Sequence, residues 1–194
     1  MATLDYYEIN GVKYAESTLD ADMSETYKRF LPLVKDKGRI LDLGCGSGRD
    51  SLAFLKAGYD VISVDGSKSL CQYASKVLNK EVICKQFSEI NYVDEFDAVW
   101  ACASLLHVKK IEMHEIFIKI AKALKQGGIF YCSYKYGNTE RKKDGREFSD
   151  YNENNLDELF SIDLGLTVVE WWISTDVRKD RSSEKWLNII ARKL

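Results

Sequence analysis

The sequence predicts an α/β fold: a doubly wound, seven-stranded mixed sheet that ends in an antiparallel edge hairpin. Apolar runs typical of buried strands alternate with amphipathic stretches between residues 39 and 137, which indicates a mainly parallel sheet built from strand and helix units. The last two apolar runs, 166–175 and 185–194, are joined only by the charged segment 176–184. Because a parallel pair needs a crossover of about a dozen residues or more, these two strands should be antiparallel.

The composition indicates one ordinary globular domain over residues 1–194. Hydrophobic residues make up 45% of the chain, and the single proline, Pro32, leaves no room for proline-rich linkers. The formal net charge of −2 provides no basic footprint for nucleic acid or for an anionic membrane. The five cysteines include no C-x-x-C pair, which favours reduced thiols and a cytoplasmic protein. With two histidines and dispersed cysteines, no metal site is expected.

The boundaries of the elements follow from local patterns. Asp22 and Glu25 predict a capping box at the start of a first helix, which Pro32 should kink or end. Ser67 is expected to cap a later helix, and Gly127 and Gly128 should stop another. The predicted strands are 39–43, 60–65, 81–87, 96–103, 129–137, 166–175 and 185–194, and the main helices are 23–34, 49–58, 68–78 and 111–128.

A glycine-rich loop follows the first strand in "LDLGCGSGRD". In an open α/β sheet such a loop lies at the carboxyl end of the strand, where ligands bind. A dinucleotide loop of the form G-x-G-x-x-G would have its third glycine where this chain has Arg49. The spacing of Gly44, Gly46 and Gly48 instead allows close backbone approach without being tailored to a phosphate. Asp65, at the end of the second strand, can accept hydrogen bonds from a ribose diol.

These residues resemble the first motif of the class I S-adenosylmethionine-dependent methyltransferases, an acidic residue followed by G-x-G-x-G. The resemblance extends to "FDAVWACASLLHV" and "ALKQGGIFYCSYKYG", and within the superfamily it is nearest to small-molecule, tellurite-resistance-like enzymes. It implies a Rossmann-like methyltransferase fold, S-adenosyl-L-methionine as cofactor, and methyl transfer to a small-molecule acceptor by direct in-line displacement. The cofactor contacts that it implies are Tyr14, Asp42, Gly44, Cys45, Gly46, Asp65, Gly66, Phe87, Ser88, Ala101 and Cys102.

His107 and Tyr134 are the candidates for a catalytic role. His107 lies at a junction of strand and helix, where an imidazole could take a proton from the acceptor or could only form local hydrogen bonds. Tyr134 would either line the acceptor pocket or pack against a helix. Cys102 is expected to be a packed neighbour of the cofactor rather than a nucleophile. Methyl transfer from a sulfonium can rely on positioning and desolvation, so no catalytic group is strictly required.

Two segments have an open role. Residues 1–22 resemble a lid over the cofactor, and a frayed end is the alternative. The polar run 138–148 is expected to be a solvated loop whose arginines and lysines could attract an anionic acceptor. A tRNA base or nucleoside acceptor and a non-catalytic role in binding the cofactor remain alternative functions. The protein is expected to be a monomer or homodimer without nucleic-acid or membrane partners.

Overall fold

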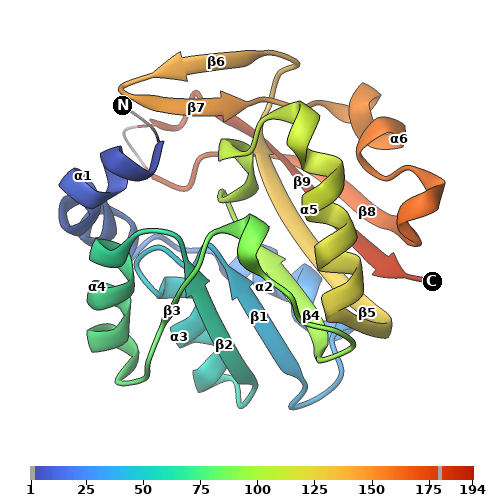
Figure 1. Cartoon of the computed structure of the whole chain (residues 1–194), viewed down its shortest axis with the longest axis horizontal. Helices are drawn as coiled ribbons and strands as arrows, with labels where there is room; N and C mark the ends of the chain where they lie inside the picture. The colour runs from blue at the N-terminus through green and yellow to red at the C-terminus, as the bar shows by residue number, and fades with distance from the viewer. Residues whose placement is uncertain (1–2, 179–180) are drawn as a thin grey trace.

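The computed structural model describes residues 3–178 and 181–194, and within them a seven-stranded sheet forms the centre of the molecule (Figure 1). Its spatial order is β3-β2-β1-β4-β5-β9-β8. Strand β9 runs antiparallel to both β5 and β8, while the other pairs are parallel, which confirms the predicted mixed sheet and edge hairpin. The strands are β1 (Arg39–Leu43), β2 (Asp60–Asp65), β3 (Ile83–Cys84), β4 (Phe96–Ala101), β5 (Leu124–Lys135), β8 (Leu166–Thr175) and β9 (Lys185–Lys193).

Helices cover both faces of this sheet. On one face α2 and α3 pack over an aromatic core in which the rings of Trp100 and Tyr131 stack with centroids 3.9 Å apart. On the other face α5 and α6 cover a larger apolar core. Ser67 caps α4 as predicted, since its hydroxyl accepts from the Leu70 amide at 3.3 Å. The helices are α1 (Thr3–Thr18), α2 (Ser24–Phe30), α3 (Arg49–Lys56), α4 (Lys68–Leu78), α5 (Lys110–Ala123) and α6 (Leu156–Leu159).

Three local predictions need correction. The capping box is absent at α2, because Asp22 accepts from the Ser24 amide while Met23 holds the N-cap position without a side-chain bond. The predicted helix stop at Gly127 and Gly128 is also wrong, since α5 ends at Ala123 and both glycines lie inside β5. Strand β3 has two residues instead of seven, because the chain turns into a 3-10 helix at Phe87–Glu89. As predicted, α2 ends before Pro32, which lies in a 3-10 turn.

The polar run expected to be a solvated loop is a β-hairpin, formed by β6 (Glu140–Lys143) and β7 (Arg146–Ser149). Its two-residue turn consists of Asp144 and Gly145, with φ of 52° and 78°. Both central residues of a type I′ turn need positive φ, and Asp-Gly is a preferred pair there. The dipeptide "DG" was therefore the signal in the sequence that identifies this hairpin.

The N-terminal segment, for which a lid and a frayed end were the two alternatives, forms a sixteen-residue helix, α1. It packs on α4 with a narrow stripe of buried residues, Tyr7, Gly11, Ala15 and Thr18. A Cβ added at Gly11 would lie 2.8 Å from the Ser69 hydroxyl oxygen, so a glycine permits this close approach of α1 to α4. The helix was missed in the sequence because its buried stripe is short and interrupted by a glycine, which has a low helix propensity.

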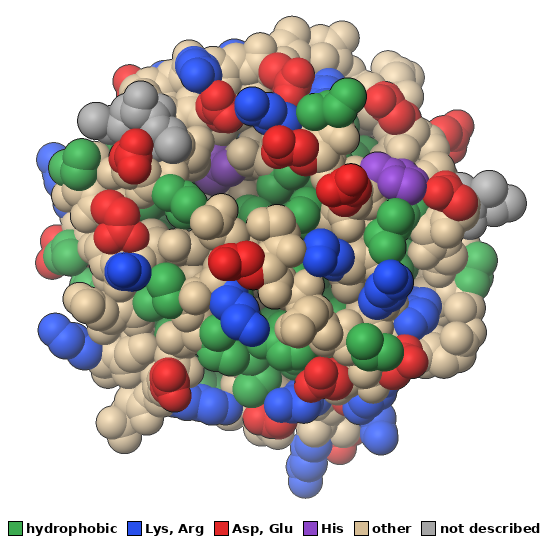
Figure 2. Space-filling model, in the orientation of Figure 1, with side chains coloured by type: hydrophobic (Ala, Val, Ile, Leu, Met, Phe, Trp, Pro, Cys, Tyr) green, Lys and Arg blue, Asp and Glu red, His purple; other side chains and the backbone are tan. Residues whose placement is uncertain are grey.

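Acidic and basic side chains are interspersed over the face of the molecule shown in Figure 2. None of the helices in the described part of the chain is long and apolar enough to cross a membrane. All five cysteines are free thiols, and Cys45, Cys71 and Cys132 are buried. A buried free thiol packs like a small apolar side chain.

Candidate active site

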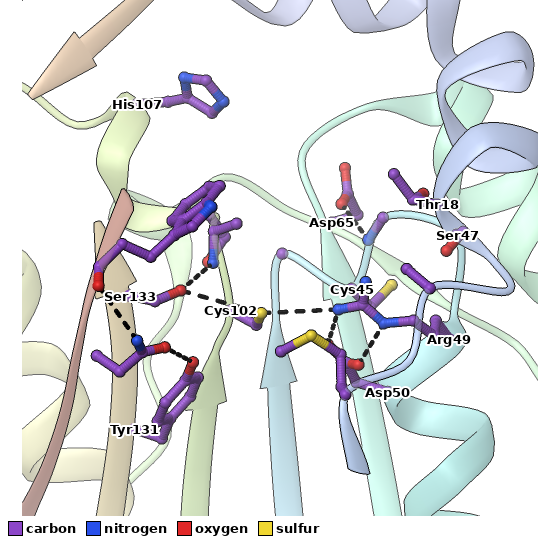
Figure 3. A pocket seen from close by; sticks show the side chains of 18 of the residues that line it. Thr18, Cys45, Ser47, Arg49, Asp50, Asp65, Cys102, His107, Tyr131 and Ser133 are labelled. Atoms are coloured by element: carbon purple, nitrogen blue, oxygen red, sulfur yellow. Dashed lines mark hydrogen bonds and ion pairs between the residues drawn. The ribbon is translucent and has the colours of Figure 1, made fainter. Parts of the chain in front are cut away.

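A cavity of about 850 Å³ opens at the carboxyl ends of β1, β2 and β4 (Figure 3). This is where the strand order reverses, with β2 on one side of β1 and β4 on the other, and such a reversal is the usual ligand site of an open α/β sheet. Helix α1 contributes wall residues from above, and β8 and β9 contribute them from the side. The cavity brings together most of the predicted cofactor contacts: Tyr14, Gly44, Cys45, Gly46, Asp65, Gly66, Phe87, Ser88 and Cys102.

The glycine loop needs its glycines for conformation and for space. Gly44 has φ of 85° and Gly46 has φ of 55°, in the left-handed region that side chains disfavour. A Cβ at Gly44 would lie 2.4 Å from the Cβ of Ser104, so β1 and the loop after β4 could not approach as they do. A Cβ at Gly46 would approach no described atom closer than Tyr14, at 4.0 Å. The loop therefore presents open backbone to the cavity at Gly46.

Asp65 holds this loop in place from the end of β2. One carboxylate oxygen accepts from the Gly46 amide at 2.9 Å, and the other accepts from the Ser67 amide at 2.9 Å. A carboxylate offers about four lone-pair sites, so each oxygen can still accept a bond from a ligand. Burial raises the pKa of Asp65, while the amides of Ser67, Gly46 and Gly66 oppose that rise. The geometry fits an acceptor for two neighbouring hydroxyl groups.

The wall next to Asp65 is partly apolar. Phe87 and Ser88 lie in the 3-10 turn after β3 and line the cavity, as does Gln86, which the sequence reasoning did not select. Leu4 of α1 lies above Gly66, where an added Cβ would come within 2.9 Å of its side chain. These groups form a slot between α1 and the turn, suited to a flat ring.

Three predicted site residues lie outside the cavity. Asp42 is buried below the glycine loop and accepts from the Ser51 hydroxyl at 2.6 Å, and burial together with nearby Asp50 raises its pKa. Ala101 is fully buried at the end of β4. Tyr134 is fully buried on the α5 side of β5, with its ring 4.7 Å from Tyr151. Side chains alternate along a strand, so Ser133 faces the cavity and Tyr134 cannot.

An ion pair at the cavity floor was also missed. Asp50 accepts two bonds from Arg49, at 2.7 and 2.8 Å, and further bonds from the Tyr27 hydroxyl at 2.5 Å and the Trp100 indole at 2.9 Å. The Arg49 guanidinium also reaches the Cys102 sulfur, 3.6 Å away (Figure 3). Burial raises the pKa of the Cys102 thiol to about 12, which agrees with its predicted role as a packed neighbour rather than a nucleophile.

His107 lines the cavity on the side opposite Asp65. Its Nδ1 lies 2.6 Å from the carbonyl oxygen of Glu147, which can only accept, so Nδ1 carries the proton. Its Nε2 lies 2.9 Å from the Tyr7 hydroxyl, which therefore donates to it. Burial, together with Arg146, lowers the pKa of His107 to about 4. His107 is thus a neutral imidazole whose Nε2 lone pair accepts the hydrogen bond from Tyr7 of α1. Its role as a general base stays a prediction.

The protonation state of His107 can be measured directly, because the chain has only two histidines. We expect the ring signals of His107 to show a neutral Nδ1–H tautomer from pH 8 down to about pH 5, with protonation only near pH 4. Proton–nitrogen correlation spectra of the imidazoles report both properties, and a His114→Gln variant assigns the signals. A His107 midpoint near 6.5, or an Nε2–H tautomer, would contradict the hydrogen-bond assignment.

Helix α1 can be tested as a cover of the cavity without removing it. In Gly11→Leu the new side chain cannot fit against Ser69 and Leu70, so α1 should lift from α4. We expect S-adenosylhomocysteine to bind roughly tenfold more weakly, a loss of about 1.4 kcal/mol from the contacts of Leu4 and Tyr14, by calorimetry. Val12→Leu, on the exposed side of α1, is the matched control. Unchanged affinity in a Gly11→Leu protein with native circular dichroism would show that α1 plays no part in cofactor binding.

The C-terminal hairpin supplies a further wall that the sequence reasoning did not foresee. Trp172 of β8 and Trp186 and Asn188 of β9 all line the cavity, whereas Trp171 is exposed on the outer side of β8. In the described residues no group of three or more histidine, cysteine or acidic side chains could hold a metal ion.

The fold and this cavity define a class: a Rossmann-like α/β domain with a glycine loop and a ribose-binding acid, but without the third glycine of a dinucleotide site. Residues 40–128 match the family model described as "Methyltransferase domain". This match, together with the relatives described below, supports a class I S-adenosylmethionine-dependent methyltransferase domain with S-adenosylmethionine as the cofactor.

Parts of this chain are similar to curated methyltransferases. The chain is 35% identical over 123 residues to "Putative methyltransferase YqeM" of Bacillus subtilis, covering 60% of this chain and 50% of that protein. It is 23% identical over 203 residues to "Probable S-adenosyl-L-methionine-dependent methyltransferase TehB" of Haemophilus influenzae, covering 93% and 64%. The chain thus spans about half to two thirds of the length of these relatives.

Among solved structures, the fold is similar to that of the Burkholderia thailandensis 1,6-didemethyltoxoflavin-N1-methyltransferase, determined with bound 1,6-didemethyltoxoflavin and S-adenosylhomocysteine. The TM-score is 0.71 at 21% identity, and the match covers 100% of this chain and 91% of that chain. At this identity the comparison establishes the shared fold.

Proposed function

We propose that this protein transfers the methyl group of S-adenosylmethionine to a small-molecule acceptor bound in the same cavity. The observation that carries the proposal is the continuity of the site: one cavity extends from the glycine loop and Asp65 to His107. A cofactor at one end and an acceptor at the other would meet near Cys102 and Ser133, inside one enclosure.

The residues of the cavity fit the cofactor. Asp65 retains free lone pairs for the ribose hydroxyls, Phe87 and Leu4 border a slot for the adenine ring, and the open backbone at Gly46 permits close approach of the ligand. When bound, S-adenosylmethionine supplies an activated methyl group on its sulfonium. The protein then has to position the acceptor and exclude water, which can provide much of the acceleration.

His107 can take part only if Tyr7 gives way. Its Nε2 accepts a hydrogen bond from the Tyr7 hydroxyl. A methyl acceptor with an N–H or O–H group would therefore have to replace that hydroxyl before it could transfer a proton to His107. The Glu147 carbonyl keeps the proton on Nδ1 and holds the ring in place during such an exchange. While the Tyr7 hydroxyl occupies Nε2, an acceptor cannot form a hydrogen bond with His107. Acceptor binding at His107 therefore requires a shift of α1 or of the Tyr7 side chain.

Two features favour a small acceptor over tRNA. Helix α1 and the C-terminal hairpin border the cavity from two sides. The net charge of −2 does not provide the overall positive charge that favours binding of a polyanion such as tRNA. The Burkholderia thailandensis enzyme named above, which has a similar fold, is a 1,6-didemethyltoxoflavin-N1-methyltransferase. A nucleoside acceptor and a purely cofactor-binding role are the alternatives.

A screen of metabolites for production of S-adenosylhomocysteine tests the proposal. We expect turnover with at least one small acceptor and no retention of tRNA on filters at low salt. Turnover only with tRNA would replace the proposed acceptor. Tight S-adenosylhomocysteine binding without turnover on any acceptor would instead favour a sensor or partner protein.

A further inference from the structure

A second cavity, of about 680 Å³, adjoins the first beneath the β6–β7 hairpin. Six residues line both cavities, so the two spaces have a common wall: Tyr7, Tyr14, Ala103, His107, Arg178 and Trp186. The hydrogen bond between Tyr7 and His107 lies in this wall. A molecule that reaches His107 from the cofactor side would therefore extend toward the second cavity.

The lining of the second cavity is strongly basic. Of its described lining residues only Asp144 and Glu184 are acidic, whereas seven are basic: Lys135, Arg141, Lys143, Arg146, Arg178, Arg181 and Lys185. This excess is local, because the chain as a whole carries a net charge of −2. A concave surface lined by one sign of charge concentrates ligands of the opposite sign.

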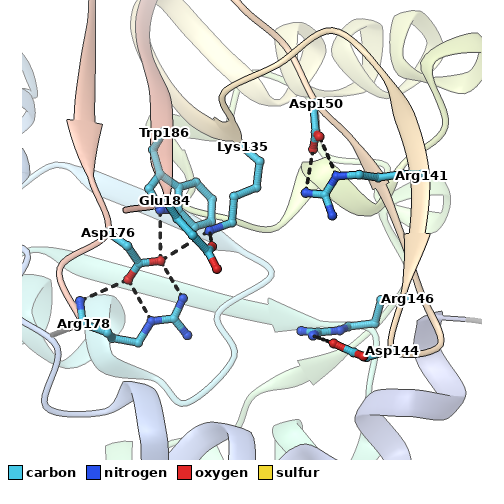
Figure 4. A network of polar contacts seen from close by, with 9 residues as sticks. All are labelled: Lys135, Arg141, Asp144, Arg146, Asp150, Asp176, Arg178, Glu184 and Trp186. Carbon is cyan, nitrogen blue, oxygen red and sulfur yellow. Dashed lines mark hydrogen bonds and ion pairs between the residues drawn. The ribbon is translucent and has the colours of Figure 1, made fainter. Parts of the chain in front are cut away.

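Several of these cations are already neutralised by carboxylates (Figure 4). Asp176 accepts from Arg178 at 2.7 and 2.9 Å, and Lys135 bridges Asp176 and Glu184. Arg141 on the hairpin forms a two-point pair with Asp150. These three basic side chains are therefore committed to the protein.

Arg146 differs from them. Its side chain is 11% exposed, yet its only ion pair in the described chain is a loose one with Asp144, at 3.9 Å, whose carboxylate is 62% exposed. Its Nε is buried and donates no hydrogen bond to any described residue. The guanidinium also forms a hydrogen bond with the Tyr7 side chain, so only its Nε–H is without an acceptor among the described residues. A buried charged donor without an acceptor is costly, so this Nε–H is available to a ligand.

The position of Arg146 is nevertheless fixed. Its guanidinium lies 4.3 Å from the ring centre of Tyr6 and 5.2 Å from that of Phe148. It extends from the hairpin toward the pair of Asp176 and Arg178 on the opposite side (Figure 4). A planar guanidinium held by aromatic rings is preorganised to bind a carboxylate or phosphate through two parallel hydrogen bonds.

We propose that the acceptor carries an oxyanion, a carboxylate or a phosphate, and that Arg146 binds this group in the second cavity while the atom to be methylated lies beside His107. This inference rests on the proposed function and names the substrate class of that site. Lys143 and Lys185, which form no ion pair within the described residues, would add attraction from the rim.

The test uses three small aromatic probes of similar shape with the S-adenosylhomocysteine complex: benzoate, phenyl phosphate and benzamide. Trp186 lines both cavities, and its indole N–H, which donates to Asp176 at 3.1 Å, is observed by proton–nitrogen spectra with Trp186→Phe as the assignment control. We expect at least one anion to bind tenfold or more tightly than benzamide, and the better anion identifies carboxylate or phosphate as the preferred group. Equal binding of all three probes, or of none, would overturn the proposal.

Variants at two positions of the β6–β7 hairpin distinguish a specific role of Arg146 from a general effect of positive charge. Arg146→Gln should weaken binding of the preferred anion at least tenfold, and Arg146→Lys should recover part of it. Lys142→Gln removes the same charge from β6, outside both cavities, and should bind like the parent. Equal anion affinity in Arg146→Gln and the parent would contradict the assignment, and if Arg146→Gln fails to fold, the probe comparison on the parent decides.

The two proposals can fail separately. Loss of anion binding in Arg146→Gln, together with no turnover on any acceptor, would remove the methyl-transfer function and retain the anion site. Turnover on neutral acceptors, with kcat/KM unchanged in Arg146→Gln, would retain the function and remove the anion site.

Discussion

Asp65→Ala should abolish measurable binding of S-adenosylhomocysteine in an ordinary calorimetric titration. The variant loses the acceptor for the ribose hydroxyls, and hydrogen bonds to a charged group contribute about 1.5–3 kcal/mol each. It also releases the Gly46 amide, which Asp65 holds at 2.9 Å, so the glycine loop loses its anchor. Two lost bonds correspond to a weakening on the order of 10² to 10⁴-fold.

The control for this prediction is Asp163→Ala, which removes an exposed carboxylate that lines neither cavity and is paired with His114 on α5. This variant should bind S-adenosylhomocysteine with the same affinity as the parent protein. Asp65→Asn retains one oxygen acceptor and should lie between the parent and Asp65→Ala. Affinity within threefold of the parent in a folded Asp65→Ala protein would show that the cofactor does not use this carboxylate.

Asp50→Ala should lower the free energy of unfolding by about 3–5 kcal/mol, the range measured when one partner of a buried ion pair is removed. The Arg49 guanidinium would remain inside, 19% exposed, without its carboxylate. The Tyr27 hydroxyl and the fully buried Trp100 indole would lose their acceptor as well. Urea denaturation measures the loss, and the melting temperature should fall by on the order of 10 °C.

The same substitution has a defined pH dependence. Burial opposes ionisation of Asp50, but Arg49 and the donors of Tyr27 and Trp100 outweigh it and hold the pKa of Asp50 below its usual value. The stabilising contribution is therefore present above about pH 4 and is lost as the pH falls through the lowered pKa. We expect the difference between parent and Asp50→Ala to shrink in acid, and a difference that stays constant down to pH 2 would contradict this account.

Local patterns predicted most of the strands and the position of the glycine loop at the sheet edge. β1 and β2 have the predicted limits, because each is a short apolar run bounded by turn residues, and Ser67 caps α4 through a bond three residues away. The glycines of the loop and Asp65 lie in one cavity for the same reason: strand ends of a parallel sheet meet at one edge.

Contacts between distant segments could not be predicted in this way. The partner of His107 is Tyr7, one hundred residues earlier, and nothing in the sequence near either residue indicates the pair. Asp50 is surrounded by groups from α2, α3 and β4, so its network exists only after the sheet has formed. For Tyr134 the sequence left two environments open, because side chains alternate along a strand and only packing against α5 determines which set faces the cavity.

Helix α1 is fastened at two points that belong to different halves of the site. Near one half, the Glu8 carboxylate accepts from the backbone amides of Lys68 and Ser69 at the start of α4. Near the other, the Thr3 hydroxyl accepts from the Glu147 amide of β7 at 2.9 Å. One rigid segment thus bridges the nucleoside side and the acceptor side. If the Tyr7 side chain alone makes way for the acceptor, and both ligands favour the seated helix, each ligand raises the affinity of the other by the same factor, as reciprocity of binding free energies requires. Release of either ligand would then lower the affinity for the other. The position of α1 would thereby link the release of the methylated product to the release of S-adenosylhomocysteine.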